Sequence, residues 1–296
     1  MCIRDSNKIG YGSGDIAGNV VWAFLNFFFM IYLTDTVGLN SGIVGTLMAL
    51  SKIFDGVTDV FFGTMIDKTK SKLGKARPWM LWPYIGNSIC LIACFTIPTE
   101  WGQSAQYAFF FIAYTMLNGV FYTANNIAYG ALTALITKND SERVQMGSLR
   151  FIFANATSLI IQAVTVNFVA ALGGGAEGWK WVAVIYAIIG LVVNTISVFS
   201  VKELPESELE HQSNNEEPKE KLTLTEAFKL LISNKYYMLL TCIYLIIHIS
   251  NGFTGVGIFY MTYVLGDANL LGTFATATNL FMIIGLLAAC LLYTSD

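Results

Sequence analysis

The sequence of 296 residues is poor in charge, histidine and cysteine. Charged residues make up 12% of the chain, whereas soluble domains carry about 25%. The two histidines, His211 and His248, lie far apart and offer no cluster for zinc or for acid–base catalysis. Of the five cysteines only Cys90 and Cys94 are closely spaced, and one helical turn between them is typical of small apolar packing residues. These shortages argue against an enzyme and predict neither a resident metal nor a cofactor.

Apolar residues are abundant instead, at 55% of the chain, and they gather in long runs separated by short polar loops. A helix needs about 20 mainly apolar residues to cross a bilayer. By this measure we expect an all-α membrane protein with eight spans. They cover residues 10–35, 43–66, 79–97, 105–136, 146–172, 181–201, 236–265 and 270–292, each boundary being approximate.

Basic residues lie almost entirely on one side of these expected spans. The loop at 67–78 is the richest, and its motif residues are Asp67, Lys68, Lys75 and Arg77. Because basic loops stay in the cytoplasm, we expect the N-terminus, this loop and the charged linker at 202–235 to be cytoplasmic. Within the linker, residues 222–235 are predicted to form an amphipathic helix at the membrane surface.

The order of spans and loops predicts the domain organisation. Six spans within residues 7–201 precede the linker at 202–235, and two more lie within residues 236–290. This order is typical of a transporter built from two six-helix halves, the second represented here by its first two helices. The stretches 1–6 and 291–296 resemble translated sequencing-adaptor sequence and are excluded from the fold, so we expect a C-terminally truncated fragment.

The second expected span carries three ionisable residues, Lys52, Asp55 and Asp59, on one helix face. A charge at membrane depth costs about 2.5–3.5 kcal/mol, so these side chains must face protein, water or a bound ion. One interpretation is a buried lysine–aspartate pair that holds helices together. The other is a cation site in which an ion relieves the repulsion between two carboxylates beside Thr58. Hard oxygen ligands of this kind suit Na⁺ or H⁺ and do not suit zinc.

Polar residues also mark the first, fourth and fifth spans. In the first, Asp15 and Asn19 lie one turn apart among glycines, and the close packing that glycines permit does not explain Asp15. Arg150, in the first turns of the fifth span, either reaches the membrane surface or serves a site. The fourth span carries a stripe suited to interhelical hydrogen bonds or to substrate contact, formed by Tyr122, Asn126 and Tyr129.

Five long stretches of the sequence carry a family resemblance. They are KIGYGSGDIAGN, YLTDTVGLNSGIVGTL, KIFDGVTDVFFGTMIDKTKSKLGKARPW, FYTANNIAYGAL and NGFTGVGIFYMTYVLGDA. In these the chain resembles the glycoside–pentoside–hexuronide cation symporters, the melibiose-permease family within the major facilitator superfamily. The resemblance covers nearly all of residues 7–290. It implies a helix bundle of twelve spans, of which eight are expected here.

The resemblance also implies two sites. The cation site of the family falls on Asp55, Thr58, Asp59 and Thr123. The sugar site falls on Asn19, Tyr122, Asn126, Gly130 and Arg150. Melibiose-permease-type members have carboxylates at the first and third sugar positions and a tryptophan at the fourth, so the galactoside-binding pattern is absent. With amides in place of carboxylates, an anionic sugar meets less repulsion, and Arg150 is expected to pair with its carboxylate. This tilts the prediction slightly toward a hexuronide, with neutral pentosides and hexosides as the rival class.

The expected function is a cation-coupled sugar symporter that imports a glycoside, pentoside or hexuronide with Na⁺ or H⁺ across the cytoplasmic membrane of a bacterium. Its expected partners are the sugar, the cation and the bilayer, with no nucleic acid. Alternatives are a facilitator-type carrier for another small solute without Na⁺ coupling, and a non-transporting membrane receptor. A channel would need ring-forming symmetry and a filter loop, and the sequence indicates neither.

Overall fold

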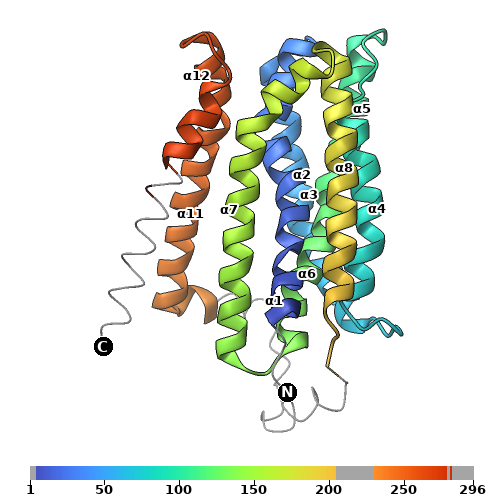
Figure 1. The fold of residues 1–296 in the computed structure, drawn as a ribbon, viewed down its shortest axis with the longest axis vertical. Coiled ribbons are helices and arrows are strands. Elements are labelled where there is room, and N and C mark those ends of the chain that lie inside the picture. Colours follow the sequence, from blue (N-terminus) through green and yellow to red (C-terminus); the bar gives the residue numbers. More distant parts are fainter. Residues whose placement is uncertain (1–4, 205–229, 279–280, 282–296) are drawn as a thin grey trace.

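The computed structural model describes residues 5–204, 230–278 and 281, and the described residues form helices and loops without a strand (Figure 1). Segments labelled η are π-helical. In chain order the elements are α1 (Asp5–Gly12), α2 (Gly14–Phe24), η1 (Leu25–Phe29), η2 (Tyr32–Thr36), α3 (Ser41–Lys68), α4 (Arg77–Cys94), α5 (Gln103–Thr115), η3 (Met116–Tyr122), α6 (Thr123–Ile136), α7 (Asp140–Ala171), α8 (Gly175–Ser200), α11 (Lys235–Gly255) and α12 (Gly257–Tyr263).

Several expected spans are assembled from more than one helical segment. The first runs through α1, α2, η1 and η2, the fourth through α5, η3 and α6, and the seventh through α11 and α12. By length and composition, three helices are suited to cross a membrane: Gln103–Ile136, Ser141–Ala171 and Gly175–Ser200. Helix α3 has the length, at 28 residues, but charged residues interrupt its centre. Most of the linker at 202–235, residues 1–4, the stretch 291–296 and most of the eighth span lie outside the described residues. Residues 5 and 6, which the sequence interpretation excluded from the fold, form the start of α1.

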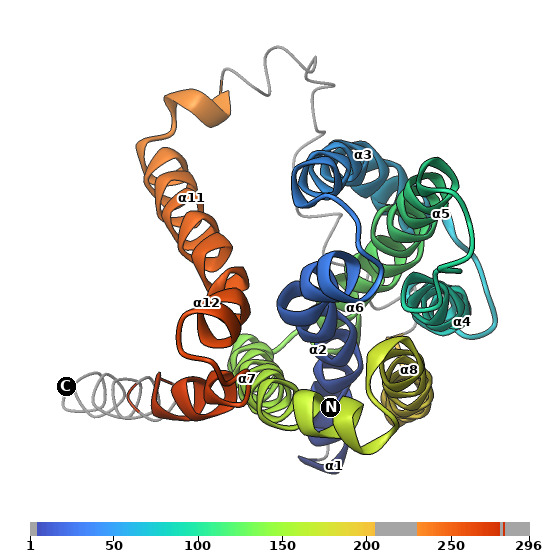
Figure 2. The ribbon, with the colours of Figure 1, turned by 90° about the horizontal axis from the view of Figure 1, so that it is seen from above.

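Aromatic side chains build the core around the first span. Helix α2 packs against α7 and α8, and Figure 2 shows it enclosed by the other helices of the bundle. Phe24 stacks on Phe95 of the α4 end with ring centroids 4.2 Å apart, and Trp179 of α8 lies 6.1 Å from Phe95. Large rings bury much area at little conformational cost. They therefore fix the first and third expected spans and α8 against one another.

Two buried asparagines join three further helices. Asn125 of α6 and Asn194 of α8 both donate to the carbonyl oxygen of Met80 in α4, at 2.7 and 2.9 Å. Asn125 also donates to the side-chain oxygen of Asn194 at 3.3 Å. A buried amide costs free energy unless it is hydrogen-bonded. This cross-link, which the sequence alone did not indicate, holds α6 in place and with it the face that carries the candidate site.

Helices α11 and α12 lie beside the bundle, with contacts to η1, and most large apolar side chains of α11 are exposed (Figure 2). The Tyr263 hydroxyl at the end of α12 donates to Asp35 Oδ2 in η2 at 2.6 Å. This hydrogen bond ties the seventh expected span to the end of the first.

We predict that Gly190→Ala destabilises the bundle. The Tyr84 hydroxyl donates to the Ala17 carbonyl oxygen at 2.8 Å, and a methyl group at Gly190 would collide with that hydroxyl. Overpacking of this kind costs about 1–3 kcal/mol. Thermal unfolding in detergent measures the loss. The matched control is Gly45→Ala in α3, whose new methyl group meets nothing within 4 Å. Equal melting temperatures for both variants would contradict the close approach.

Candidate functional site

Asp15 and Arg150 form an ion pair inside the bundle. Asp15 lies in the first turn of α2, and Arg150 lies about three turns into α7, which begins at Asp140. Arg150 Nε donates to Asp15 Oδ2 at 2.6 Å, and Nη2 donates to Oδ1 at 3.5 Å. The side chains are 26% and 15% exposed. The expected alternatives for Arg150 omitted this partner, and α7 begins at Asp140, before the approximate start expected for the span at residue 146.

Two tyrosines surround this ion pair. The Arg150 guanidinium carbon lies 4.1 Å from the ring centroid of Tyr129 and 5.9 Å from that of Tyr11, a cation–π arrangement. The Tyr129 hydroxyl donates to Asp15 Oδ2 at 3.2 Å and to the Tyr11 carbonyl oxygen at 2.8 Å. Tyr129 therefore makes the interhelical hydrogen bonds that were one interpretation of the polar stripe, and Asp15, unexplained by glycine packing, is the counter-ion of Arg150.

Lys52 and Asp55 form a second ion pair, within α3. Lys52 Nζ lies 2.8 Å from Asp55 Oδ2, and the side chains are 57% and 17% exposed. Because both residues belong to one helix, the pair does not hold helices together, so that interpretation is wrong. The other carboxylate oxygen, Asp55 Oδ1, is buried without a hydrogen-bond partner among the described residues. An unpartnered carboxylate oxygen is costly in an apolar setting and is a suitable ligand for a cation.

Asp55 and Thr58 face the fourth expected span at Gly119. A Cβ atom added at Gly119 would lie 3.2 Å from Asp55 Oδ1 and 3.9 Å from Thr58 Oγ1. In the structure, Thr58 Oγ1 donates to the carbonyl oxygens of Phe54 and Asp55 in its own helix, at 3.0 and 3.1 Å. Beside Gly119, Thr115 Oγ1 is also buried without a hydrogen-bond partner in the described part of the chain. The structure therefore brings two of the four expected cation ligands to one place on η3.

The other two expected cation ligands, Asp59 and Thr123, lie one turn further along. Helix α3 packs against both η3 and α6, and the two helices end at the same end of the bundle (Figure 1). Asp59 follows Asp55 by four residues and is exposed, while Thr123 follows Gly119 by four residues and is buried. Both therefore follow by one helical turn the residues that meet at Gly119. The described residues contain no group of three or more histidine, cysteine or acidic side chains placed to hold a metal ion.

The expected sugar residues lie in different surroundings. Asn19 Nδ2 donates to the Asp15 carbonyl oxygen at 2.9 Å. Asn126 is exposed, and a Cβ atom added at Gly130 would meet nothing within 4 Å, so both border open space. Tyr122 lines a cavity of about 120 Å³. Arg150 is bound to Asp15 and does not line this cavity. The residues expected to bind sugar are therefore not all gathered on the wall of this one cavity.

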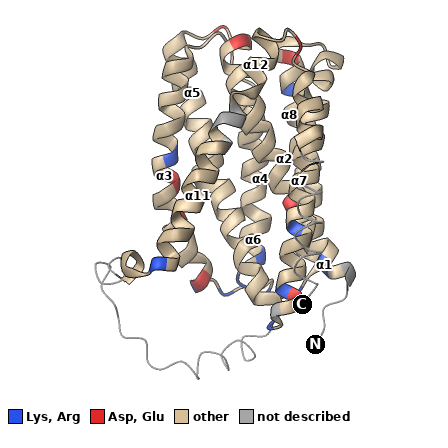
Figure 3. Ribbon diagram, turned by 90° about the vertical axis from the view of Figure 1, so that its left-hand side faces the viewer, with Lys and Arg blue, Asp and Glu red and all other residues tan. Residues whose placement is uncertain are grey.

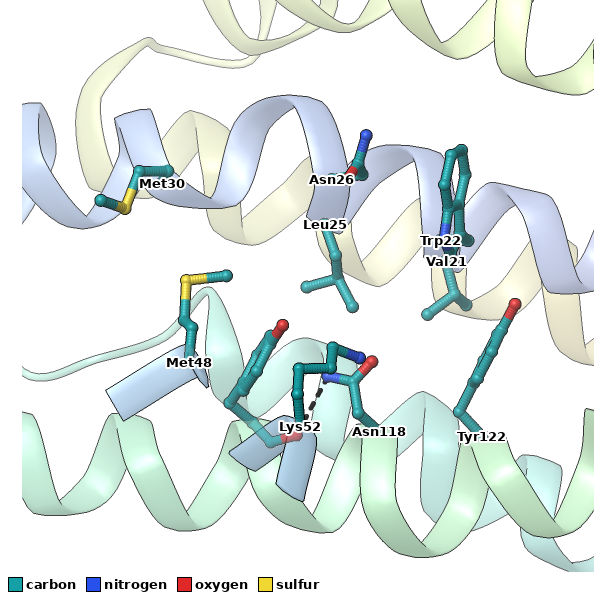
Figure 4. A pocket seen from close by; sticks show the side chains of 10 residues that line it. Val21, Trp22, Leu25, Asn26, Met30, Met48, Lys52, Asn118 and Tyr122 are labelled. Atoms are coloured by element: carbon teal, nitrogen blue, oxygen red, sulfur yellow. Dashed lines mark hydrogen bonds between the residues drawn. The ribbon is translucent and has the colours of Figure 1, made fainter. Parts of the chain in front are cut away.

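The cavity lies between the first, second and fourth expected spans (Figure 4). Its lining residues are Val21, Trp22, Leu25, Asn26, Met30, Met48, Lys52, Tyr114, Asn118 and Tyr122. The sequence interpretation missed Trp22, Asn26 and Asn118. Helical spacing contained the signal, because Asn118 precedes Tyr122 by one turn and Asn26 follows Asn19 by two. A cavity with an indole, two amides, two phenols and an ammonium group suits a polar ligand with an apolar face.

The loop motif lies at the end of the bundle where Lys and Arg residues gather (Figure 3). Arg77 Nε donates to the Val198 carbonyl oxygen at 2.9 Å, and Asp67 and Lys68 are exposed. The Glu203 carboxylate accepts the backbone N–H groups of Lys75, Ala76 and Arg77, at 2.6, 3.0 and 3.0 Å. Negative charge at a helix N-terminus is favourable. Glu203 therefore fixes the loop at the start of α4, a role that its place in the expected linker did not suggest.

Comparison with known proteins identifies the family. Residues 10–294 match the model of the family described as MFS/sugar transport protein. The chain is 29% identical to a putative glycoside/cation symporter, YagG, of Escherichia coli over 96% of this chain and 60% of the relative. It is 32% identical to the isoprimeverose transporter of Lactiplantibacillus pentosus over 67% of this chain and 42% of the relative. It is also 32% identical to a glucuronide carrier protein homolog of Escherichia coli over 50% of this chain and 32% of the relative.

The chain therefore belongs to the MFS/sugar transport protein family, a family of membrane transporters and not of enzymes, in which several relatives are named as symporters. This confirms the resemblance to the glycoside–pentoside–hexuronide symporters. The chain spans three fifths or less of the length of each of these relatives.

We predict that Gly119→Ala weakens cation binding in the full-length protein. The added methyl group would lie 3.2 Å from Asp55 Oδ1, so the carboxylate must move or its helix must shift. A loss of about tenfold, or ~1.4 kcal/mol, is expected. The ion concentration that gives half-maximal sugar uptake measures it. Gly147→Ala in α7, where the methyl group meets nothing within 4 Å, is the control. An unchanged ion requirement in Gly119→Ala would contradict the role given to this contact.

Proposed function

We propose that the full-length protein is a cation-coupled sugar symporter that carries a glycoside, pentoside or hexuronide with Na⁺ or H⁺. The observation that carries this proposal is Asp55 Oδ1, a buried carboxylate oxygen without a hydrogen-bond partner in the described residues, aimed at η3. Such an oxygen attracts a small cation. In this proposal the ion binds Asp55, Thr58, Asp59 and Thr123, and the sugar binds between the first, fourth and fifth expected spans.

Coupling follows because one helix serves both ligands. The helix formed by α5, η3 and α6 presents Gly119 and Thr123 to the proposed ion and Tyr122 and Asn126 to the proposed sugar. An ion between Asp55 and Asp59 removes their mutual repulsion and allows α3 to pack more closely on η3 and α6. The closer packing fixes the position of Tyr122. Each ligand then increases the affinity for the other by the same factor.

The proposed arrangement in the membrane completes this function. We propose eight spans of an expected twelve, with residues 7–201 as the six-helix first half and residues 236–290 as the start of the second. The end of the bundle rich in Lys and Arg (Figure 3) would face the cytoplasm by the positive-inside rule, in the inner membrane of a bacterium. The linker at 202–235 would then be cytoplasmic.

A carrier without Na⁺ coupling is the second candidate function, and one observation favours it. Lys52 Nζ lies 2.8 Å from Asp55 Oδ2 and compensates this carboxylate without an ion. Lys52 is 57% exposed, however, and solvent weakens such a pair. A coupling cation can therefore displace the ammonium group from Asp55. A receptor that does not transport has no particular observation in its favour.

Ion-driven uptake tests the proposal. Full-length protein in sealed vesicles should accumulate labelled sugar when an inward Na⁺ or H⁺ gradient is applied. Asp55→Asn and Asp59→Asn should each abolish accumulation, because each removes a charge that the ion needs. Exchange of labelled for unlabelled sugar should survive, because the sugar contacts lie on other residues. Asp267→Asn, in an exposed turn, is the matched control and should accumulate sugar normally. Full ion-driven accumulation in both site variants would rule out this site, and downhill uptake that ignores every gradient would favour the facilitator.

A further inference from the structure

We propose that Ser51 and Thr115 are further ligands of the coupling ion and that this ion is a metal cation such as Na⁺, an inference that rests on the proposed function. The observation that carries it is a set of three buried side-chain oxygens without a hydrogen-bond partner among the described residues: Asp55 Oδ1, Ser51 Oγ and Thr115 Oγ1. Buried polar atoms are normally hydrogen-bonded, so each such atom requires an explanation. One cation bound between the three oxygens would provide a partner for all of them.

The hydroxyl group of Ser51 does not make the hydrogen bond that is common inside a helix. A serine or threonine there often donates to a carbonyl oxygen about one turn earlier. In α3, Thr46 donates to the Gly42 carbonyl oxygen at 2.8 Å, and Thr64 donates to that of Phe61 at 2.8 Å. Ser51 is fully buried and has no hydrogen-bond partner within the described part of the chain. Its oxygen is therefore available to a ligand that binds between the helices.

Ser51 shares the inner face of α3 with Asp55. The buried and half-buried residues Met48, Ser51, Asp55 and Thr58 follow one another at intervals of three or four residues, which is the spacing of one helix face. Phe54, which does not belong to this series, is exposed. Asp55 and Thr58 face the fourth expected span at Gly119. The side of α3 that carries Ser51 is therefore the side that faces this span.

Thr115 lies on the opposing helix, close to the same carboxylate. A Cβ atom added at Gly119 would lie 3.2 Å from Asp55 Oδ1 and 4.0 Å from Thr115 Cγ2. Next to Thr115 in the sequence, the ring centroid of Tyr114 lies 6.0 Å from Lys52 Nζ. These contacts place Thr115 opposite the turn of α3 that ends at Asp55.

The kind of ligand indicates the class of ion. A carboxylate oxygen and two hydroxyl oxygens are hard ligands, which suit a small hard cation. A proton bound to Asp55 Oδ1 could donate a hydrogen bond to one hydroxyl oxygen at a time, whereas a metal cation contacts all three oxygens together. Lys52 is bound to the other carboxylate oxygen, Oδ2, at 2.8 Å and so leaves the Oδ1 side open to the ion.

The class of ion is tested by thermal unfolding, which requires no knowledge of the sugar. Purified full-length protein in detergent is heated in NaCl, in LiCl or in choline chloride at one pH and one ionic strength. An ion that binds only the folded state raises the melting temperature. We expect saturating NaCl to raise the Tm of the wild type by about 2 °C or more above its value in choline chloride.

Variants test the two hydroxyl groups. Ser51→Ala and Thr115→Val each remove one oxygen and should raise the Na⁺ concentration for half of the maximal melting shift by about fivefold or more. Thr115→Ser keeps the oxygen and should resemble the wild type. The matched control is Thr46→Ala, because the Thr46 hydroxyl is bound to its own helix. A buried hydroxyl without a partner does not stabilise a fold, so in choline chloride Ser51→Ala should melt no lower than the wild type.

Two results would overturn the inference and leave the symporter intact. One is the accumulation of sugar under a proton gradient by a protein whose melting temperature neither Na⁺ nor Li⁺ raises. The other is an unchanged Na⁺ requirement in folded Ser51→Ala or folded Thr115→Val. If Thr115→Val does not fold, Ser51→Ala decides. Failure of the full-length protein in vesicles to accumulate sugar under either gradient would overturn the proposed function and this inference with it.

Discussion

Arg150 and Asp15 neutralise each other inside a helix bundle, at a depth where either charge alone would be costly. Breaking a buried ion pair by removing one partner typically costs about 3–5 kcal/mol, because the remaining charge is left uncompensated. The pair fixes α7 against α2, and Tyr129 joins α6 to the same carboxylate. Three of the expected spans therefore meet at one carboxylate, and the positions of their polar faces follow from it.

The charged residues of α3 are paired less completely than Asp15 and Arg150. Lys52 pairs with one oxygen of the Asp55 carboxylate, Oδ2. The other oxygen, Oδ1, is buried without a partner among the described residues. The two clusters thus differ in how fully they are satisfied. The cluster around Asp15 is saturated by an arginine and a tyrosine, which suits a structural and specificity role. The cluster around Asp55 is incomplete, which suits a site that an ion enters and leaves. Helix η3 faces the second cluster and also carries Tyr122 to the cavity.

Much of the fold could be predicted from the sequence, because apolar runs of about 20 residues are typical of helices that cross a membrane. The helical character of the chain and its family follow from those runs and from the motifs around Asp55 and Asn126. Single-helix patterns could not reveal partners on other helices. Asp15 and Arg150 lie 135 residues apart, and nothing in local spacing links them. Glu203 likewise lay in a charged stretch that reads as linker, although its carboxylate binds three backbone N–H groups across the bundle end. The spacing of residues predicts which of them share a helix face. The residues of other helices that this face contacts are known only from the packed structure.

The central claim is that ion and sugar bind to one coupled site on the fourth expected span. Isothermal titration of purified full-length protein tests it most directly. The affinity for a transported sugar is measured with and without the coupling ion, and the affinity for the ion is measured with and without the sugar. Linkage requires that both affinities change by the same factor, and about fivefold or more is expected for coupled sites. If both affinities rise by the same factor of about five or more, this agrees with coupling through η3, which contacts Asp55 and carries Tyr122. A sugar affinity that is the same with and without the ion would contradict the coupling.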